Sequence, residues 1–298
     1  MILKYFKRFW PVGIFVIVLL LLNIHRSNYG IQATVSFDGV RAYQDIERQV
    51  SFGPRVMGSL AHQEAVAYIL RKLQFSRWET SIQTGEWNGY AVTNIAARRG
   101  TQGPWIIIGA HYDSRFIADQ DPDAGKRHEP VPGANDGASG VAVLLELARV
   151  LPESFPKQVW LVFFDAEDNG NIPGWEWILG SSQFVDSLNE CPESTVVIDM
   201  IGDVNLNIHY EYNSDPKLME DIWSVAEGAG FNTQFIPSYR FAMLDDHTPF
   251  LMKGCKAADL IDFDYPGWHT THDTPDKVSP ESLYAVGETL RRWLMGSE

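Results

Sequence analysis

Three short apolar runs, each ending in acidic residues, constrain the fold of this chain most strongly. They are WIIIGAHYDS (105–114), VWLVFFDAED (159–168) and STVVIDMIGD (194–203). Runs this short and this apolar are typical of strands buried on both faces of a sheet. Because helical patterns lie between them, we predict an α/β fold, a three-layer α/β/α sandwich around a mostly parallel mixed sheet.

Four segments show the spacing of apolar residues that is typical of helices. They are residues 60–74, 139–151, 216–230 and 279–294. In the last segment Ser279 is a suitable N-cap, and Pro280 suits the first helical position. A further strand is predicted at YAVTNIAARRG (90–100), where alternation ends in a glycine turn.

Acidic and histidine side chains follow the predicted strands and gather in a few other motifs. They occur as His111 and Asp113, as Asp165, Glu167 and Asp168, as Asp199 and Asp203, and in GANDGASG (133–140), LDDH (244–247) and WHTTHDT (268–274). The carboxyl ends of parallel strands share one edge of the sheet, where such folds bind their ligands. So many carboxylates in one cleft require a compensating cation. Carboxylate and imidazole ligands without thiolates favour catalytic zinc over magnesium or manganese.

The motif GANDGASG has two readings that the residues alone leave open. Its glycines predict a tight turn into the helix that begins near Ser139. Asp136 is then either the N-terminal cap of that helix or a metal ligand held at its start.

The N-terminal region predicts a membrane segment. No charged residue occurs from Phe9 to Ile24, and Lys4, Lys7 and Arg8 precede this run. We expect an uncleaved signal anchor at 1–30, a tether at 31–37 and a catalytic domain at 38–298 outside the cytoplasm. A cleaved signal peptide and, less in keeping with the pattern, a buried helix are the alternatives.

The net charge argues against one class of partner, and the cysteine content limits the possible metal ligands. The net charge of −14 argues against nucleic acid, because phosphate binding needs a basic surface. Cys191 and Cys255 form no metal-binding motif, so any metal has oxygen and nitrogen ligands. The two cysteines could pair in an oxidising compartment, but we expect each to be a small buried hydrophobic residue.

Together these motifs resemble a known family. HYDSR, ADQDPD, GANDGASGVAVLLELARVL, FFDAED, WILGS, IDMIGD, DDHTPF and WHTTHDT are similar to the M28 zinc-peptidase superfamily. Within it they look most like the glutaminyl-peptide cyclotransferases of the bacterial zinc type. The resemblance covers residues 38–296 and implies conversion of an N-terminal glutamine to pyroglutamate with release of ammonia. An M28 aminopeptidase is the alternative.

The resemblance also implies roles for individual residues. Asp136, Asp168 and His269 would hold zinc, and Asp168 stands where many relatives have glutamate. Glu167 would be the general base and acid. A proton-relay network would contain two further acids, Asp199 and Asp245.

The same resemblance implies a substrate pocket and leaves the metal count open. Trp268 and either Trp175 or Trp177 would line the pocket for the N-terminus of a peptide or protein. His111 and Asp199 occupy the positions that hold a second metal in two-zinc aminopeptidases, so one zinc is expected for a cyclase and two for a peptidase. We predict structural or supporting roles for Asp165, His209, His247 and His272.

Overall fold

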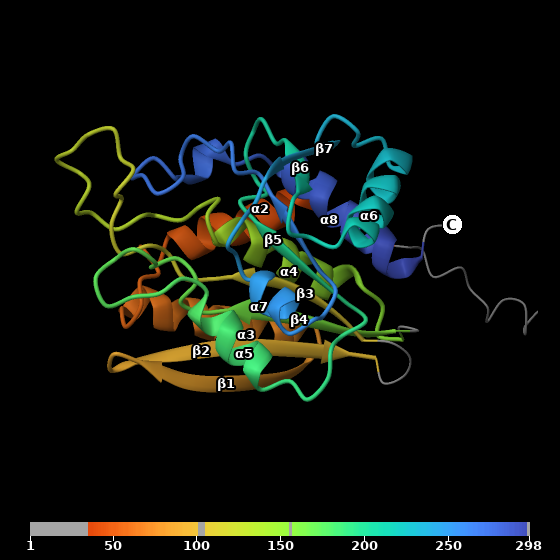
Figure 1. Cartoon of the computed structure of the whole chain (residues 1–298), viewed down its shortest axis with the longest axis horizontal. Coiled ribbons are helices and arrows are strands. Elements are labelled where there is room, and N and C mark those ends of the chain that lie inside the picture. The colour runs from red at the N-terminus through yellow and green to blue at the C-terminus, as the bar shows by residue number, and fades with distance from the viewer. Residues whose placement is uncertain (1–34, 101–104, 155–156, 297–298) are drawn as a thin grey trace, which may run out of the picture. The chain divides into compact units, whose positions relative to one another are not determined.

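A six-stranded sheet with the order β1-β2-β4-β3-β5-β8 lies at the centre of the computed structural model (Figure 1), which describes residues 35–100, 105–154 and 157–296. The strands are β1 (Glu79–Trp87), β2 (Tyr90–Arg99), β3 (Trp105–His111), β4 (Gln158–Phe164), β5 (Ser194–Asp199) and β8 (Ala257–Ile261). β4, β3, β5 and β8 run parallel, whereas β1 pairs with β2, and β2 with β4, in antiparallel fashion. The predicted α/β fold with a mixed sheet is confirmed.

Side chains of the central strands alternate between two separate cores. In β3, Ile106 and Ile108 belong to the larger core and Ile107 to the smaller one. The same alternation places Leu161 and Val162 of β4 on opposite faces. The sequences of these strands are continuous apolar runs because both faces of the sheet are buried there.

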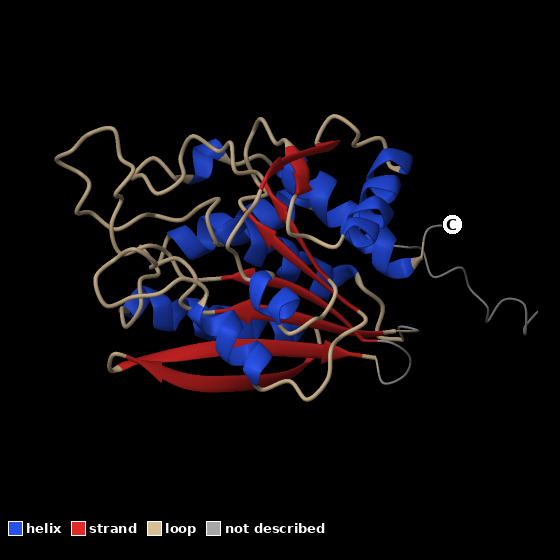
Figure 2. Ribbon diagram, in the orientation of Figure 1, coloured by secondary structure: helices blue, strands red, loops and turns tan. Residues whose placement is uncertain are grey.

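Helices supply the other side of each core (Figure 2). The larger core is built with α2 (Gly39–Val50), α3 (Leu60–Phe75), α4 (Ala138–Val150), α6 (Pro216–Gly228) and α8 (Pro280–Met295). The smaller core is built with α5 (Leu179–Asp186) and α7 (Thr248–Met252). The four predicted helices are therefore present, and the Ser279 side chain caps α8 by accepting from the N–H of Ser282.

Several elements have no counterpart among the predictions. They are α2, β1, α5, α7, β8 and a small parallel sheet of β6 (Ile208–Glu211) and β7 (Phe235–Phe241). In β1 no residue is fully buried, because this strand lies at the edge of the sheet, so its sequence lacks a clear apolar alternation. Such strands depend on their neighbours rather than on their own pattern.

The expectation that the two cysteines are unpaired is wrong. Cys191 and Cys255 form a disulfide with a Cα–Cα distance of 5.3 Å. The reason is topological: Cys191 precedes β5, Cys255 precedes β8, and these strands are parallel neighbours paired from Thr195 and Ala257 onward. Both cysteines therefore lie at the amino ends of the strands, opposite the edge where the acids gather.

The predicted membrane segment at 1–30 lies outside the described residues, as does most of the tether at 31–37. In the part of the chain that the structure describes, no helix has the length and apolar character needed to cross a membrane.

Candidate metal centre and pocket

The carboxyl ends of β4, β5 and β8 open into a cavity of about 220 Å³. Most of the predicted site residues line it. The lining consists of Asp136, Glu167, Asp168, Trp177, Asp199, Met200, Met243, Leu244, Asp245, Ile261, Phe263, Trp268 and His269. The site thus lies where an α/β sheet places its ligands.

The three predicted zinc ligands converge at the base of this cavity. Nε2 of His269 lies 2.8 Å from Oδ1 of Asp168 and 3.8 Å from Oδ2 of Asp136. All three side chains are buried, and Oδ2 of Asp168 has no hydrogen-bond partner among the described residues. Two buried carboxylates beside an imidazole fit zinc, which takes nitrogen and oxygen ligands and in catalytic sites keeps one position open for water or substrate.

A second set of ligand-type atoms shares Asp136 with the first. Nε2 of His111 lies 3.1 Å from Oδ1 of Asp136 and 3.2 Å from Oδ1 of Asp199. Asp136 therefore directs one oxygen to each histidine. The structure brings together both residues predicted for a second metal, His111 and Asp199, and places Asp136 next to them.

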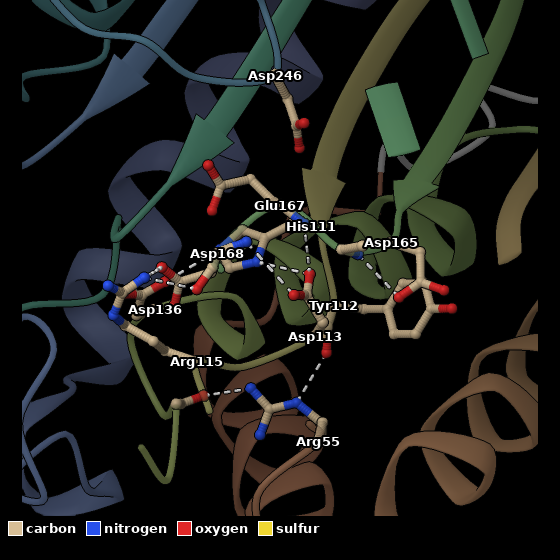
Figure 3. A network of polar contacts seen from close by, with 12 residues as sticks. Arg55, His111, Tyr112, Asp113, Arg115, Asp136, Asp165, Glu167, Asp168 and Asp246 are labelled. Carbon is tan, nitrogen blue, oxygen red and sulfur yellow. Dashed lines mark hydrogen bonds and ion pairs between the residues drawn. The ribbon is translucent and has the colours of Figure 1, made fainter. Parts of the chain in front are cut away.

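Unusual backbone conformations occur just after β4, just after β5 and at the ligand candidate His269. Ala166, Met200 and His269 have φ values of 53°, 48° and 54°, a region that residues other than glycine seldom adopt. The turn at Ala166 immediately precedes Glu167 and Asp168. Asp113 holds this turn by accepting hydrogen bonds from the N–H groups of Glu167 (3.1 Å) and Asp168 (3.4 Å) (Figure 3). From the sequence, Asp113 is counted among the acids at this edge of the sheet but has no predicted role of its own.

Asp136 is not the N-cap of α4, and its side chain lines the cavity instead. The N-cap of α4 is Gly137, with φ of 89° and no side-chain cap. A Cβ atom there would lie 2.8 Å from the carbonyl oxygen of Asp113, so glycine is required. Asp273 fixes the loop by accepting from the N–H groups of Asn135 (2.8 Å) and Asp136 (3.1 Å).

Glu167 lies in the cavity wall, and only 7% of its surface is exposed. Burial, together with the charges of Asp168 and Asp245, raises the pKa of this carboxyl well above its usual value, although the charge of His111 acts in the opposite direction. No hydrogen bond to the Glu167 carboxylate occurs among the described residues, whereas its N–H is fixed by Asp113. The carboxyl group is therefore available to a ligand in the cavity.

Asp199 and Asp245 are both buried beside Glu167, as the proposed relay requires. Burial raises the pKa of Asp199 to about 7, even though its hydrogen bond with His111 lowers it. Behind Asp245 lie acids that the sequence interpretation did not assign. Asp246 is fully buried and points toward Glu167 (Figure 3), and Asp259 of β8 meets Asp245 and His247 in a third group of ligand-type atoms.

The three tryptophans separate into two groups. Trp177 and Trp268 line the cavity, and their rings are stacked with that of His269 at centroid distances of 6.0 and 3.8 Å. Trp175 packs instead against Tyr90 (5.1 Å) and Phe116 (5.0 Å) and does not line the cavity. The sequence could not choose between Trp175 and Trp177, and the geometry favours Trp177.

The remaining polar residues have positions that suit supporting roles. Asp165 pairs with buried His62 (2.7 Å) and accepts from the N–H of Thr93 (2.6 Å). His247 is buried between Glu211 (3.5 Å) and Asp259 (3.8 Å). Neither His209, which contacts Ser238, nor the exposed His272 lines the cavity. Asp203 lies near Val278 in an isolated bridge and is not part of the site.

Comparison with solved structures shows close similarity to two enzymes of related design. A glutaminyl cyclase from Porphyromonas gingivalis is 30% identical, with a TM-score of 0.82, and the match covers 87% of this chain and 98% of that one. A Zn-dependent exopeptidase from Parabacteroides distasonis is 28% identical, with a TM-score of 0.83, and the match covers 89% of this chain and 100% of that one.

Among curated proteins, the aminopeptidase YwaD of Bacillus subtilis is 30% identical over 202 residues, or 62% of this chain. The match covers only 39% of YwaD, and the chain likewise spans less than two thirds of the other curated relatives that it matches first. The model of Peptidase family M28 matches residues 94–294, which contain both sets of metal-ligand candidates and the cavity. The chain therefore belongs to peptidase family M28.

Proposed function

We propose that this protein is a zinc-dependent glutaminyl-peptide cyclotransferase that converts the N-terminal glutamine of peptides or proteins to pyroglutamate. The observation that carries the proposal is the cavity. It is smaller than the roughly 300–1,000 Å³ typical of drug-sized ligand sites, and it places Glu167 beside the zinc-ligand set of Asp136, Asp168 and His269. A space of this size suits one terminal residue with its α-amine. The likeness to the Porphyromonas gingivalis glutaminyl cyclase supports the same reaction.

Asp136, Asp168 and His269 are the residues that would hold the zinc ion. Bound zinc supplies Lewis acidity to the γ-carboxamide oxygen of the substrate. The unpartnered oxygen of Asp168 and the convergence of two buried carboxylates support occupancy by a cation, because like charges are costly to bury together.

Glu167 is the residue that would move the proton. In the reaction, the α-amine nitrogen bonds to the γ-carboxamide carbon, the bond from that carbon to its amide nitrogen breaks, and ammonia leaves. Glu167 takes a proton from the attacking amine and returns it to the departing nitrogen, so it acts first as a base and then as an acid. Its carboxyl group lies in the cavity wall, and its main chain is fixed by Asp113.

The walls of the cavity favour cyclisation over hydrolysis. Met200, Ile261, Phe263 and Trp268 contribute apolar and aromatic side chains to the lining of the cavity. Apolar and aromatic walls exclude the water that would otherwise compete with the amine.

A zinc aminopeptidase is the second candidate, and one specific observation favours it. Asp136 directs its two oxygens to two separate histidines, which is the arrangement a bridging ligand needs in a two-metal site. The likeness to YwaD and to the Zn-dependent exopeptidase points the same way. Glu167 would then deprotonate a water molecule.

A single incubation separates the two reactions. The purified protein is given a short peptide that begins with glutamine and, in parallel, the same peptide with an N-terminal leucine. We expect the first peptide to lose ammonia without becoming shorter and the second to stay intact. Release of free glutamine or leucine would establish the aminopeptidase instead.

We also propose that the catalytic domain works outside the cytoplasm, attached by its N-terminal segment. The Cys191–Cys255 disulfide supports this location, because disulfides persist in oxidising compartments. The uncharged run from Phe9 to Ile24 supports an anchor. Protease added to intact cells should degrade the domain, and recovery of the protein from a soluble cytoplasmic fraction would refute the proposal.

A further inference from the structure

The loop between β3 and α4 brings an acidic residue to the outer side of the zinc-ligand histidine. Oδ1 of Asp119 lies 3.5 Å from Nδ1 of His269, while Nε2 of the same ring faces Asp168 at 2.8 Å. The two ring nitrogens of His269 therefore have different neighbours. One faces the metal-ligand set, and the other faces an acid that belongs to none of the three groups of ligand candidates in the described part of the chain.

Asp119 is itself held in place by a buried arginine. Nε and Nη2 of Arg115 donate to the two oxygens of Asp119 at 2.8 and 3.1 Å, the bidentate geometry that fixes a carboxylate most firmly. Arg115 also donates to the backbone carbonyls of Asp168 (3.0 Å) and Gly170 (3.1 Å). One guanidinium group thus ties Asp119 to the segment that carries a second ligand, Asp168.

Stacking of the two tryptophan rings on His269 does not by itself determine where the nitrogens of the imidazole lie. The rings of Trp177 and Trp268 lie within 15° and 26° of the plane of the histidine ring. This arrangement fixes the plane, but a half-turn of the ring about its Cβ–Cγ bond keeps the same plane and places carbon atoms where the two nitrogens lie. The contact of Nδ1 with Asp119 distinguishes the two orientations, because a protonated Nδ1 donates toward the carboxylate and leaves the lone pair of Nε2 for a metal.

We propose that Asp119 is a positioning residue for the metal centre: held by Arg115, it orients His269 so that Nε2 faces the zinc ion. The inference deepens the proposed zinc site and rests on it. It applies equally to a cyclase and to an aminopeptidase, because both need His269 as a ligand.

Asp119 has a second effect on the metal site, because it pairs with the positive charge of Arg115. Nη1 of Arg115 lies 3.8 Å from Oδ1 of Asp168, a carboxylate that the cation also needs. While Asp119 is present, the guanidinium charge is already paired. Without that partner the guanidinium would compete with the cation for Asp168, so loss of the Asp119 charge weakens metal binding through both ligands.

The test measures zinc binding directly and needs no substrate. Zinc affinity is determined by competition with a chromogenic chelator for the wild-type protein, Asp119→Asn, Asp119→Glu and Asp123→Asn. Asp123 is the matched control, an exposed acid in the same loop whose side chain, among the described residues, accepts a hydrogen bond from the N–H of Gly125 alone. We expect Asp119→Asn to weaken zinc binding about 10- to 100-fold, Asp119→Glu to recover part of the loss, and Asp123→Asn to match the wild type.

The thermal midpoint of each metal-free protein distinguishes positioning from folding. Because about a third of the Asp119 side chain is exposed, the metal-free midpoint of Asp119→Asn should stay close to that of the wild type. Wild-type zinc affinity in Asp119→Asn, or a loss of affinity that only follows a loss of folding, would overturn the inference. A wild-type protein that binds no zinc would overturn the proposed function together with it. A shift in affinity without cyclase activity would leave this inference standing and refute the cyclase.

Discussion

Oδ1 of Asp136 lies 3.1 Å from Nε2 of His111, on the side of the carboxylate away from His269. In a two-metal enzyme both residues would be ligands of the second ion. In a one-metal enzyme the contact between them would only hold Asp136 in place. The role of the contact between His111 and Asp136 therefore distinguishes the proposed cyclase from the zinc aminopeptidase.

Substitution of His111 tests which of these roles the contact has. For His111→Gln we expect the zinc content to remain at one ion per chain after dialysis, because Asp136, Asp168 and His269 are untouched. Zinc per chain is measured by atomic emission, with circular dichroism as the check on folding. A wild-type content of two ions that falls to one in the variant would identify His111 as a metal ligand.

Removal of the Glu167 carboxylate should abolish proton transfer but not metal binding. We expect Glu167→Gln to lower kcat by roughly 100- to 10,000-fold, the usual contribution of a general acid–base group. KM and zinc content should change little, because Glu167 belongs to none of the three groups of metal-ligand candidates among the residues that the structure describes. Steady-state kinetics with a glutamine peptide provide the measurement, and an unchanged kcat would refute proton transfer by Glu167.

The two neighbouring tryptophans form a matched pair of variants. Trp177 lines the cavity beside His269, whereas Trp175 packs against Tyr90 and Phe116 outside it. We expect Trp177→Leu to raise KM for a glutamine peptide about tenfold, equivalent to the roughly 1.4 kcal/mol of lost binding. Trp175→Leu should leave KM near the wild-type value. Equal effects of the two substitutions would contradict the assignment of the cavity wall.

Glu211 should make the stability of the fold sensitive to acid. Despite burial, the imidazole of His247, 3.5 Å away, and hydrogen bonds from the N–H groups of Met243 and Asn213 lower the pKa of this carboxyl to about 2. Because the pKa in the folded protein is lower than in the unfolded chain, the ionised group stabilises the fold above about pH 4.5. That contribution is lost as the pH falls from about 4.5 toward 2.

The corresponding experiment compares thermal unfolding of the wild type with that of Glu211→Gln across this pH range. At pH 7 the variant should be less stable by roughly 1.5–3 kcal/mol, the usual worth of hydrogen bonds to a charged group. The difference should shrink as the wild-type carboxyl becomes protonated. A constant difference between pH 7 and pH 3 would show that the charge of Glu211 does not stabilise the fold.

Much of the fold and of the site could be predicted because the relevant signals are local. A strand buried on both faces is apolar along its whole length, so β3, β4 and β5 were visible as runs, and the acids at their carboxyl ends marked one edge of the sheet. The residues predicted as zinc ligands lie together in the structure. Their assignment came from resemblance to a family rather than from spacing.

The remaining features depend on which segments become neighbours, and the sequence carries little information about this. Cys191 and Cys255 meet only because β5 and β8 are adjacent strands. Asp119 reaches His269 from a loop 150 residues earlier in the chain, and nothing in the local sequence distinguishes it from Asp121 or Asp123. Trp175 and Trp177 have similar sequence surroundings but face different neighbours, because the backbone of this loop sets their directions.

The measurement that tests the central claim most directly is a zinc add-back titration with product identification. The protein is stripped of metal with a chelator and dialysed, and zinc is returned in steps in the presence of a peptide that begins with glutamine. Mass spectrometry follows both the pyroglutamyl peptide and any shortened peptide. We predict that pyroglutamyl peptide forms in proportion to added zinc and saturates at one ion per chain, with no shortened product. Shortened peptide that appears only as a second ion binds would contradict the account.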